Sequence, residues 1–264
     1  MNKRLMFSAA VVMTLLSANA QKRAFTIEDL YRVKGLSSVS LSPDGKTVCY
    51  TVSSSDLKNQ KSGSDIYIMN ADGSHAKALT EDGKSSSAVW SKDGKSIFFT
   101  NNEKGTAQIF RMDLTTCETE QVTDYELGIG SPVISPDERY IAFTAEVYPD
   151  LGADAKANKA RMEKKEQGPV QAHIADKLLY RHWTSYNDGR CNHLILFDTQ
   201  TKTYKDLTPG NYSLIFVVGG GITYQFSPDS KEICFVSNHD EHQEASTNAD
   251  LWTVSVNGGR TGLH

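Results

Sequence analysis

Two histidines three residues apart are the strongest candidates for metal chemistry in this sequence. His239 and His242 stand in the run His-Asp-Glu-His-Gln-Glu (239–244), which offers the imidazole and carboxylate ligands that zinc binds. The run is not the His-Glu-x-x-His pattern, which places two histidines on one face of a helix. It also falls between two predicted strands, where a polar hairpin loop is the simpler interpretation. We therefore predict no metal site and no cofactor.

Three consecutive glycines, Gly219 to Gly221, raise the question of phosphate binding. A phosphate-binding loop needs a lysine and the start of a helix directly after its glycines, and here a predicted strand follows instead. A flexible crossing between two structural units is the better interpretation.

The secondary structure that would position such side chains can be predicted from a sequence motif, called the phrase below, that occurs four times. Each copy has a serine, a turn and then a strand of large apolar residues. The serines are separated by 49, 44 and 92 residues, and repeats of about 45 residues with four strands each are typical of propeller blades. The copies are Ser42–Tyr50, Ser91–Phe99, Ser135–Phe143 and Ser227–Phe235.

The composition of the phrase explains why it should form a blade. In Ser42-Pro43-Asp44-Gly45, proline presets φ, aspartate bonds the nearby backbone and glycine tolerates positive φ, so the phrase predicts a tight turn. The strand after each turn is apolar without alternation, as expected for a strand covered on both faces. Blades stacked around an axis need such strands. We predict an all-β fold, a partial, open β-propeller of about four blades with WD40-like repeats.

A second strand follows each copy, and its spacing reveals an insertion. The strand begins 24, 18, 59 and 24 residues after its serine, so the third blade carries extra residues at about 148–190. Within them, 153–167 has helical composition, and Val170, Ile174 and Leu178 suggest a second, amphipathic segment. We expect each unit to close on a fourth strand that contains Leu79-Thr80, Val122-Thr123 or Leu207-Thr208.

The first twenty residues have the pattern of a secretory signal peptide. Lys3 and Arg4 precede an apolar stretch from Leu5 to Leu16, and Ala18-Asn19-Ala20 fits a cleavage site. The apolar stretch is too short for a membrane span. We predict cleavage between Ala20 and Gln21 and a periplasmic or secreted protein.

The charge of the chain bears on its partners, and the positions of its cysteines bear on whether it forms disulfides. The formal net charge is −4, no basic residues cluster with aromatic ones, and nucleic acid is therefore not an expected partner. Cys49 and Cys234 occupy the same apolar position in their repeats, which favours buried free thiols. We expect Cys117 and Cys191 to be reduced as well.

The segment before the repeats, 21–37, predicts a short helix and a lead-in. Thr26 suits an N-cap, and Glu28 and Asp29 are acidic residues in the first turn. Phe25 and Leu30 are placed for a hydrophobic staple. The remaining residues, 38–264, would form the four blades.

Several phrases, in this order, resemble the amino-terminal half of bacterial serine peptidases of the prolyl-oligopeptidase family S9, in particular the dipeptidyl-peptidase 5 and acylaminoacyl-peptidase-like members. They are Phe25–Leu30, Val39–Lys46, Lys177–Trp183, Asp188–Arg190, His193-Leu194 and Asp206–Gly210. The resemblance covers nearly all of the predicted mature chain.

The resemblance implies a propeller that works with a C-terminal α/β-hydrolase domain and its Ser-Asp-His triad. Such a triad places its serine on a Gly-x-Ser-x-Gly elbow, and no serine of this sequence has that context. We expect the hydrolase domain to be absent and the chain to be inactive alone, so no catalytic residue is assigned. Related dipeptidyl peptidases hold the substrate amino terminus with glutamates of a propeller insertion, but no motif assigns that role to Glu163 or Glu166. Arg181 and Trp183 are candidates for anchoring the insertion.

The sequence thus predicts an exported propeller that gates substrate entry in a peptidase, with short peptides as ligands and the hydrolase domain as structural partner. The alternative is a TolB-like periplasmic propeller that acts by protein binding alone. Against the alternative, residues 21–37 offer no spare strand for closing a small ring.

Overall fold

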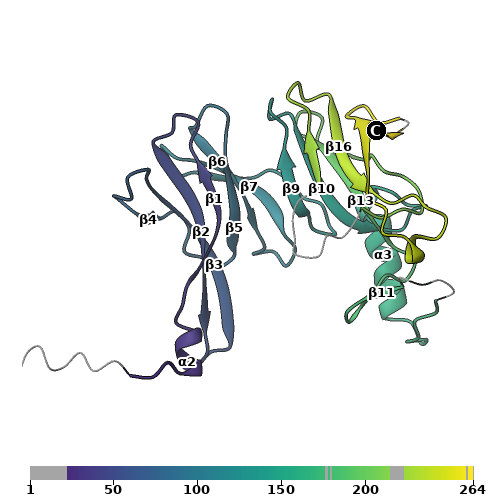
Figure 1. Ribbon diagram of the computed structural model, residues 1–264, viewed down its shortest axis with the longest axis horizontal. Helices are drawn as coiled ribbons and strands as arrows, with labels where there is room; N and C mark the ends of the chain where they lie inside the picture. Colours follow the sequence, from purple (N-terminus) through teal and green to yellow (C-terminus); the bar gives the residue numbers. More distant parts are fainter. Residues whose placement is uncertain (1–22, 176–177, 179, 215–222, 260, 264) are drawn as a thin grey trace, which may run out of the picture.

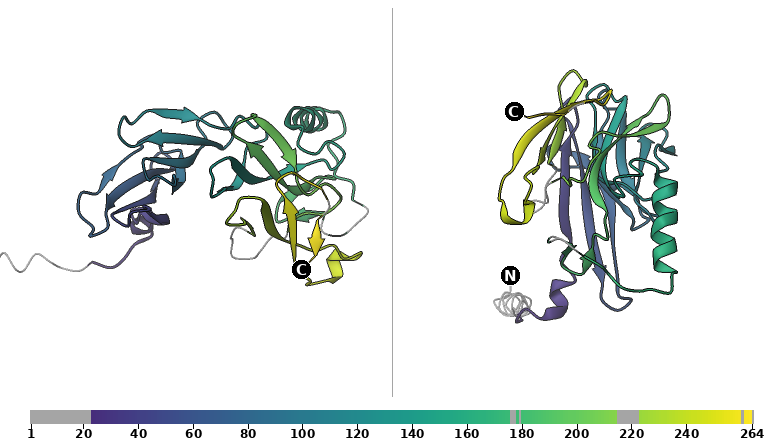
Figure 2. Two further views of the ribbon diagram at one scale, coloured as in Figure 1. Left: turned by 90° about the horizontal axis from the view of Figure 1, so that it is seen from above. Right: turned by 90° about the vertical axis from the view of Figure 1, so that its right-hand side faces the viewer.

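The computed structural model describes residues 23–175, 178, 180–214, 223–259 and 261–263. Within them, the strands form four antiparallel, four-stranded sheets and one two-stranded hairpin. The sheets follow one another along the chain as four blades arranged in an open arc (Figures 1 and 2). The predicted all-β, open propeller is confirmed.

The strands of each blade are adjacent in sequence order. The first blade consists of β1 (Gly35–Leu41), β2 (Thr47–Asp56), β3 (Lys61–Asn70) and β4 (Lys77–Ala78). The second consists of β5 (Ser85–Trp90), β6 (Ser96–Asn101), β7 (Gln108–Asp113) and β8 (Thr119–Gln121). The third consists of β9 (Gly130–Ile134), β10 (Tyr140–Val147), β13 (Cys191–Asp198) and β14 (Thr203–Asp206). The fourth consists of β15 (Tyr224–Phe226), β16 (Glu232–Ser237), β17 (Asp250–Ser255) and β18 (Gly262–Leu263).

The repeated turn is held by its serine and aspartate. In the second blade, Ser91 Oγ donates to Asp93 Oδ1 at 2.7 Å and accepts the Ser96 amide at 2.9 Å. The other three turns have the same serine–aspartate bond. The residue after the aspartate has positive φ in every copy, including the two copies that lack glycine there: Gly45, Gly94, Glu138 and Ser230. The turn therefore keeps its geometry in the third and fourth copies, where Glu138 and Ser230 replace the preferred glycine.

The core lies between the blades. Residues six and eight positions after each serine face the preceding blade, as Ile97 and Phe99 do when they pack with Cys49 of the first blade. The residue at position seven faces the next blade, as Phe98 does when it packs with Ile141 and Phe143. This alternation explains the unbroken apolar runs of β6 and β10, because both faces of these central strands are covered.

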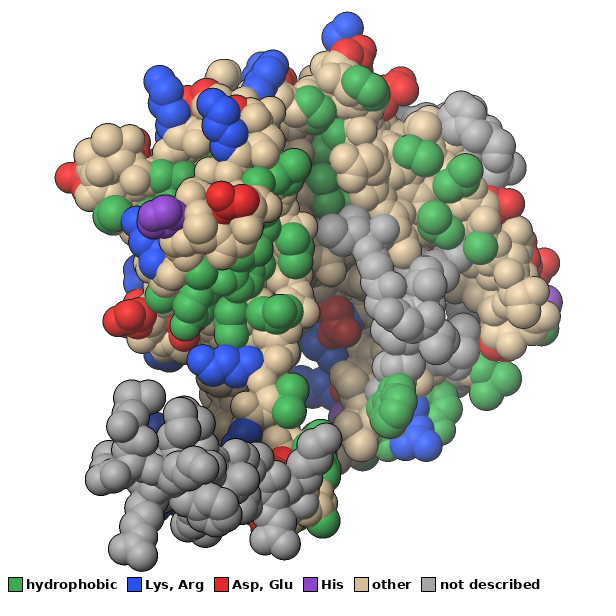
Figure 3. Space-filling model, turned by 60° about the vertical axis from the view of Figure 1, so that its left-hand side comes forward, with side chains coloured by type: hydrophobic (Ala, Val, Ile, Leu, Met, Phe, Trp, Pro, Cys, Tyr) green, Lys and Arg blue, Asp and Glu red, His purple; other side chains and the backbone are tan. Residues whose placement is uncertain are grey.

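The first blade presents the same kind of face with no described blade against it. Val48 and Tyr50 occupy the positions of Ile97 and Phe99, which are 0% and 2% exposed. Beside them on β1, Leu36 and Val39 are each 69% exposed. The face is hollowed into an apolar groove of about 420 Å³. Figure 3 shows hydrophobic side chains gathered on this outer face.

The predicted position of the closing phrases was wrong. Leu79-Thr80, Val122-Thr123 and Leu207-Thr208 follow β4, β8 and β14 instead of lying on them. The threonine hydroxyls accept amide hydrogens of the third strands, with Thr80 2.9 Å from the Ile66 nitrogen. Thr123 and Thr208 do the same at Ile109 and Leu194. The amides of the residues before these threonines still donate to the carbonyls of the same third-strand residues, as Leu79 does to Ile66 at 2.7 Å, so the threonine side chain completes the pairing just beyond the strand.

The lead-in contains the short helix α2 (Ile27–Leu30). Thr26 is its N-cap, and the Thr26 amide donates to Asp29 at 2.9 Å, so the predicted start of the helix is confirmed. Phe25 and Leu30 are 70% and 61% exposed and do not form the buried staple that the sequence suggested.

The insertion of the third blade leaves at the end of β10 and returns at the start of β13, where Val147 pairs with Cys191. It contains α3 (Ala155–Glu166) and the hairpin of β11 (Arg181–His182) and β12 (Ser185–Tyr186). The predicted first helix is confirmed. The predicted second segment was wrong, since residues 168–175 are not helical and Val170 and Ile174 are exposed. Their spacing cannot form a helix against solvent alone.

Two features of the sequence fall outside the described residues: the predicted signal peptide at 1–20 and the Gly219–Gly221 crossing. No helix in the described part of the chain has the length and apolar character of a membrane span. All four cysteines are free.

Candidate functional site

One face of the propeller carries the features most suited to ligand binding. The second strand of each blade ends at this face and the third begins there, so the blade 3 insertion also projects from it. α2, α3 and the β11–β12 hairpin all lie on this side of the arc (Figure 1). Two adjacent pockets open where these strand ends meet.

The first pocket, of about 470 Å³, lies between the second and third blades beneath the insertion. Glu146 at the end of β10 and Arg190 just before β13 form an ion pair at 3.0 Å in its wall. Met162 contributes the α3 side. Arg190 also donates to the carbonyls of Tyr186 and Asn187, at 2.7 and 3.0 Å. Arg190 therefore fastens the β12 end of the insertion to the blade.

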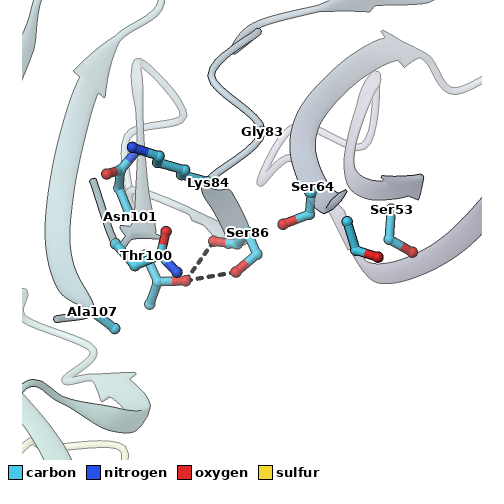
Figure 4. A pocket seen from close by; sticks show the side chains of 11 residues that line it. Ser53, Ser64, Gly83, Lys84, Ser86, Thr100, Asn101 and Ala107 are labelled. Atoms are coloured by element: carbon cyan, nitrogen blue, oxygen red, sulfur yellow. Dashed lines mark hydrogen bonds between the residues drawn. The ribbon is translucent and has the colours of Figure 1, made fainter. Parts of the chain in front are cut away.

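The second pocket, of about 330 Å³, lies between the first and second blades. Its wall consists of small polar residues and one lysine (Figure 4): Ser53, Ser62, Gly63, Ser64, Gly83, Lys84, Ser86, Thr100, Asn101, Asn102 and Ala107. Ala107 lines both pockets. The two pockets are therefore neighbours on this face, and the pair is called the blade 1–3 groove below.

The carboxylate of Asp188 stabilises the part of the insertion between α3 and the β11–β12 hairpin. Asp188 accepts Lys165 Nζ at 2.7 Å and lies 2.9 Å from His173 Nδ1. Burial raises the pKa of Asp188, but Lys165 and His173 outweigh it and the net pKa is lowered. The His173 ring stacks on Tyr186 with centroids 3.8 Å apart. This cluster holds residues 168–175 against the β11–β12 hairpin.

The residues that the sequence singled out in the insertion are not in the groove. Glu163 and Glu166 are exposed and line neither pocket. Trp183 lies at the hairpin turn with φ +49° and is 83% exposed, and Arg181 donates to its carbonyl at 3.3 Å. Arg181 and Trp183 thus shape the tip of the hairpin.

The candidate metal-binding run has a different role in the structure. The His239 ring stacks between Tyr212 and Trp252, with centroid distances of 3.9 and 4.0 Å. Burial lowers the pKa of His239. His242 lies 3.2 Å from Glu244. Among the described residues, no group of histidine, cysteine and acidic side chains is arranged to hold a metal ion.

A repeated polar clasp was missed by sequence reasoning. In the first three blades, the residue before the core of the third strand bonds the segment that crosses to the next blade. Asp65 accepts the Gly83 amide at 3.0 Å, and Gln108 bonds both the amide and the carbonyl of Tyr125. In the third blade, His193 lies 2.9 Å from the Gly210 carbonyl. Aligning the blades on Ile66, Ile109 and Leu194 would have revealed this position.

Comparison with known proteins agrees with these features. The profile of the PD40 family, the TolB β-propeller domain, matches residues 15–167. The chain belongs to this family. As a PD40 propeller it is 30% identical to dipeptidyl-peptidase 5 of Porphyromonas gingivalis over 99% of its own length, and it spans 39% of that relative. These matches identify it as the propeller of a peptidase-like protein, as the sequence resemblance predicted.

Solved structures support the fold of the PD40 propeller. It matches the acylaminoacyl peptidase of Pyrococcus horikoshii with a TM-score of 0.62 and 18% identity, over 89% of this chain and 33% of that one. It matches TolB of Acinetobacter baumannii with a TM-score of 0.52 and 19% identity, over 86% of this chain and 42% of that one.

Proposed function

We propose that this chain is the propeller part of an exported dipeptidyl-peptidase-like serine peptidase, in which it admits short peptides to a catalytic domain. The observation that carries the proposal is the 30% identity to dipeptidyl-peptidase 5 across 99% of the chain. The 264 residues contain no Gly-x-Ser-x-Gly elbow, so the catalytic serine would have to lie outside them.

The blade 1–3 groove supports a role in peptide handling. Its two pockets, of about 330 and 470 Å³, have the size of ordinary ligand sites. Hydroxyl and amide groups line one part, and Glu146, Arg190 and Met162 line the other. An extended peptide has backbone donors and acceptors at every residue, which such a mixed wall can satisfy.

The same face supports docking of the hydrolase domain as a structural partner. α2 exposes Ile27 and Leu30 by 70% and 61%, and the insertion exposes Ile174 and Trp183 by 87% and 83%. Large apolar side chains exposed together on one face mark interaction surfaces. A domain seated there would cover these side chains and enclose the groove.

Peptide binding by the purified chain tests this role. Ala107→Trp would fill the junction of the two pockets and should abolish binding of a tripeptide measured by calorimetry. Ala76→Trp, on an exposed turn of the first blade, is the matched control and should bind as the unaltered chain does. Unchanged binding by the Ala107→Trp protein, with an unchanged melting temperature, would remove the groove from the proposal.

The absence of catalysis is tested separately. The chain alone should neither react with a fluorophosphonate serine probe nor cleave dipeptidyl-naphthylamides. Labelling of any serine within these 264 residues would contradict the proposal.

A protein-binding function of the TolB kind is the second candidate, and the PD40 profile favours it because that profile is named for TolB. A propeller of this kind would bind no tripeptide. The coding sequence beyond codon 264 also separates the candidates, since only a peptidase would continue into a Gly-x-Ser-x-Gly elbow.

A further inference from the structure

We propose that the hydroxyl-rich pocket between the first and second blades binds the terminal carboxylate of a short peptide, with Lys84 as its cationic group. The inference rests on the proposed function and assigns an end of the ligand to one end of the blade 1–3 groove.

The charge of the pocket is the first argument. Lys84 is the one charged residue in its wall, and no carboxylate lines it. The carboxylate of Asp82, two residues earlier, accepts hydrogen bonds from the Lys84 amide at 2.7 Å, from Ser85 Oγ at 2.9 Å and from Asn101 Nδ2 at 2.6 Å. A small pocket with a cation and no acid favours an anionic group.

The second argument is that Lys84 forms no ion pair with any described residue. Within the described residues, no acidic oxygen lies within ion-pair distance of Lys84 Nζ, whereas Lys159 and Lys165 on the insertion are paired with Glu126 and Asp188. Lys84 directly precedes β5, the first strand of its blade, and Figure 4 shows its side chain extending along the pocket wall toward Asn101. Its ammonium group is available to a ligand.

Neutral donors around the lysine are the third argument. The hydroxyl of Ser64 and the side-chain amide of Asn102 form no hydrogen bond within the described part of the chain, although both line the pocket. By contrast, Ser86 and Thr100 bond each other at 2.9 Å. A carboxylate accepts several hydrogen bonds at once, so it can use an ammonium, a hydroxyl and an amide together.

The path of the groove favours a peptide as the source of the carboxylate. Ala107 also lines the neighbouring pocket, whose wall contains the Glu146–Arg190 ion pair, so a ligand anchored at Lys84 that extends past Ala107 would reach the surface beneath the insertion. The pocket at Lys84 contains no aromatic side chain on which a sugar or a base could stack.

Calorimetry with Ala-Ala-Phe and its C-terminal amide tests the inference. The free acid should bind about fivefold more tightly than the amide, a difference near the upper end for an exposed ion pair, and added salt should reduce it. Lys84→Gln should abolish the difference and Lys84→Arg should retain it. Lys77→Gln, which removes an exposed lysine on the outer strand β4, should leave the difference unchanged.

The outcomes distinguish the inference from the proposed function. Equal affinity for acid and amide would overturn the inference and leave peptide binding intact. Binding of neither peptide would overturn both. Competition by inorganic phosphate that depends on Lys84, in a chain that binds neither peptide, would identify a site for free oxyanions and would likewise overturn the peptide assignment.

Discussion

The buried His193 ring lies between two acceptors, with Nδ1 2.8 Å from Asp206 Oδ2 and Nε2 2.9 Å from the Gly210 carbonyl. His193 is 0% exposed. Because both acceptors lack a hydrogen, both ring nitrogens must donate, and the ring is a protonated imidazolium. All three residues belong to the phrases that first linked this sequence to the peptidase family. Their role is to tie β13 to the crossing toward the fourth blade.

Removing the histidine should destabilise the chain strongly. His193→Ala leaves the Asp206 carboxylate buried without its charge partner, which should cost about 3 kcal/mol of unfolding free energy. His193→Gln should cost less, because Gln108 performs the equivalent clasp in the second blade. Urea unfolding followed by circular dichroism measures both values. Equal losses for the two variants would show that the charge, and not the hydrogen bonding, stabilises the clasp.

The stability of the chain should depend on pH through the same residue. Burial alone would lower the pKa of His193, but hydrogen bonds to Asp206, Cys191 and Gly210 raise it to about 9. A raised pKa means that the folded state holds the proton more tightly than the unfolded chain, where histidine titrates near 6.5. The stabilisation is therefore complete below about pH 6.5 and is lost as pH rises through 9. Melting temperatures from pH 6 to 10 should fall less steeply for His193→Gln than for the unaltered chain.

Removal of one buried polar side chain should make local unfolding of the insertion easier. Asn158 is the buried residue of α3, and its side chain accepts the Tyr148 amide at 2.6 Å and donates to the Gly152 and Asp154 carbonyls. Asn158→Ala removes all three bonds, so local opening should become easier by about 2 kcal/mol. Limited trypsin digestion should then cut α3 roughly thirtyfold faster, while Lys156→Ala, an exposed change on the same helix, should not have this effect. Faster cutting throughout the blades would indicate global unfolding instead.

The sequence correctly predicted strands that pack against other described residues, and it failed for an exposed apolar segment of the insertion. The strands after Ser91 and Ser135 were predictable because each is buried on both faces, so their composition reflects one dominant constraint. Val170 and Ile174 were misassigned because helical spacing has meaning only where a surface covers the apolar side. The groove was not foreseen, since Lys84 and Glu146 lie on different blades and only the stacking of the blades brings their pockets together.

The predicted export of the chain has a direct chemical test. If the signal peptide is cleaved after Ala20, the secreted or periplasmic form should begin at Gln21 and lack the first twenty residues. Intact mass spectrometry of the fractionated protein measures this directly. A cytoplasmic product that retains Lys3 and Arg4 would contradict the prediction.

The outer face of the first blade should make the chain self-associate. Val48 and Tyr50 correspond to side chains that are buried in every later blade, and Leu36 and Val39 beside them are exposed. A double substitution, Leu36→Lys with Val39→Lys, places like charges on this face and should reduce both aggregation and binding of a hydrophobic dye. Val170→Lys, an equally exposed position on the insertion, is the control and should have little effect. Light scattering that decreased equally for both proteins would show that association arises from general surface charge and not from the unpartnered blade.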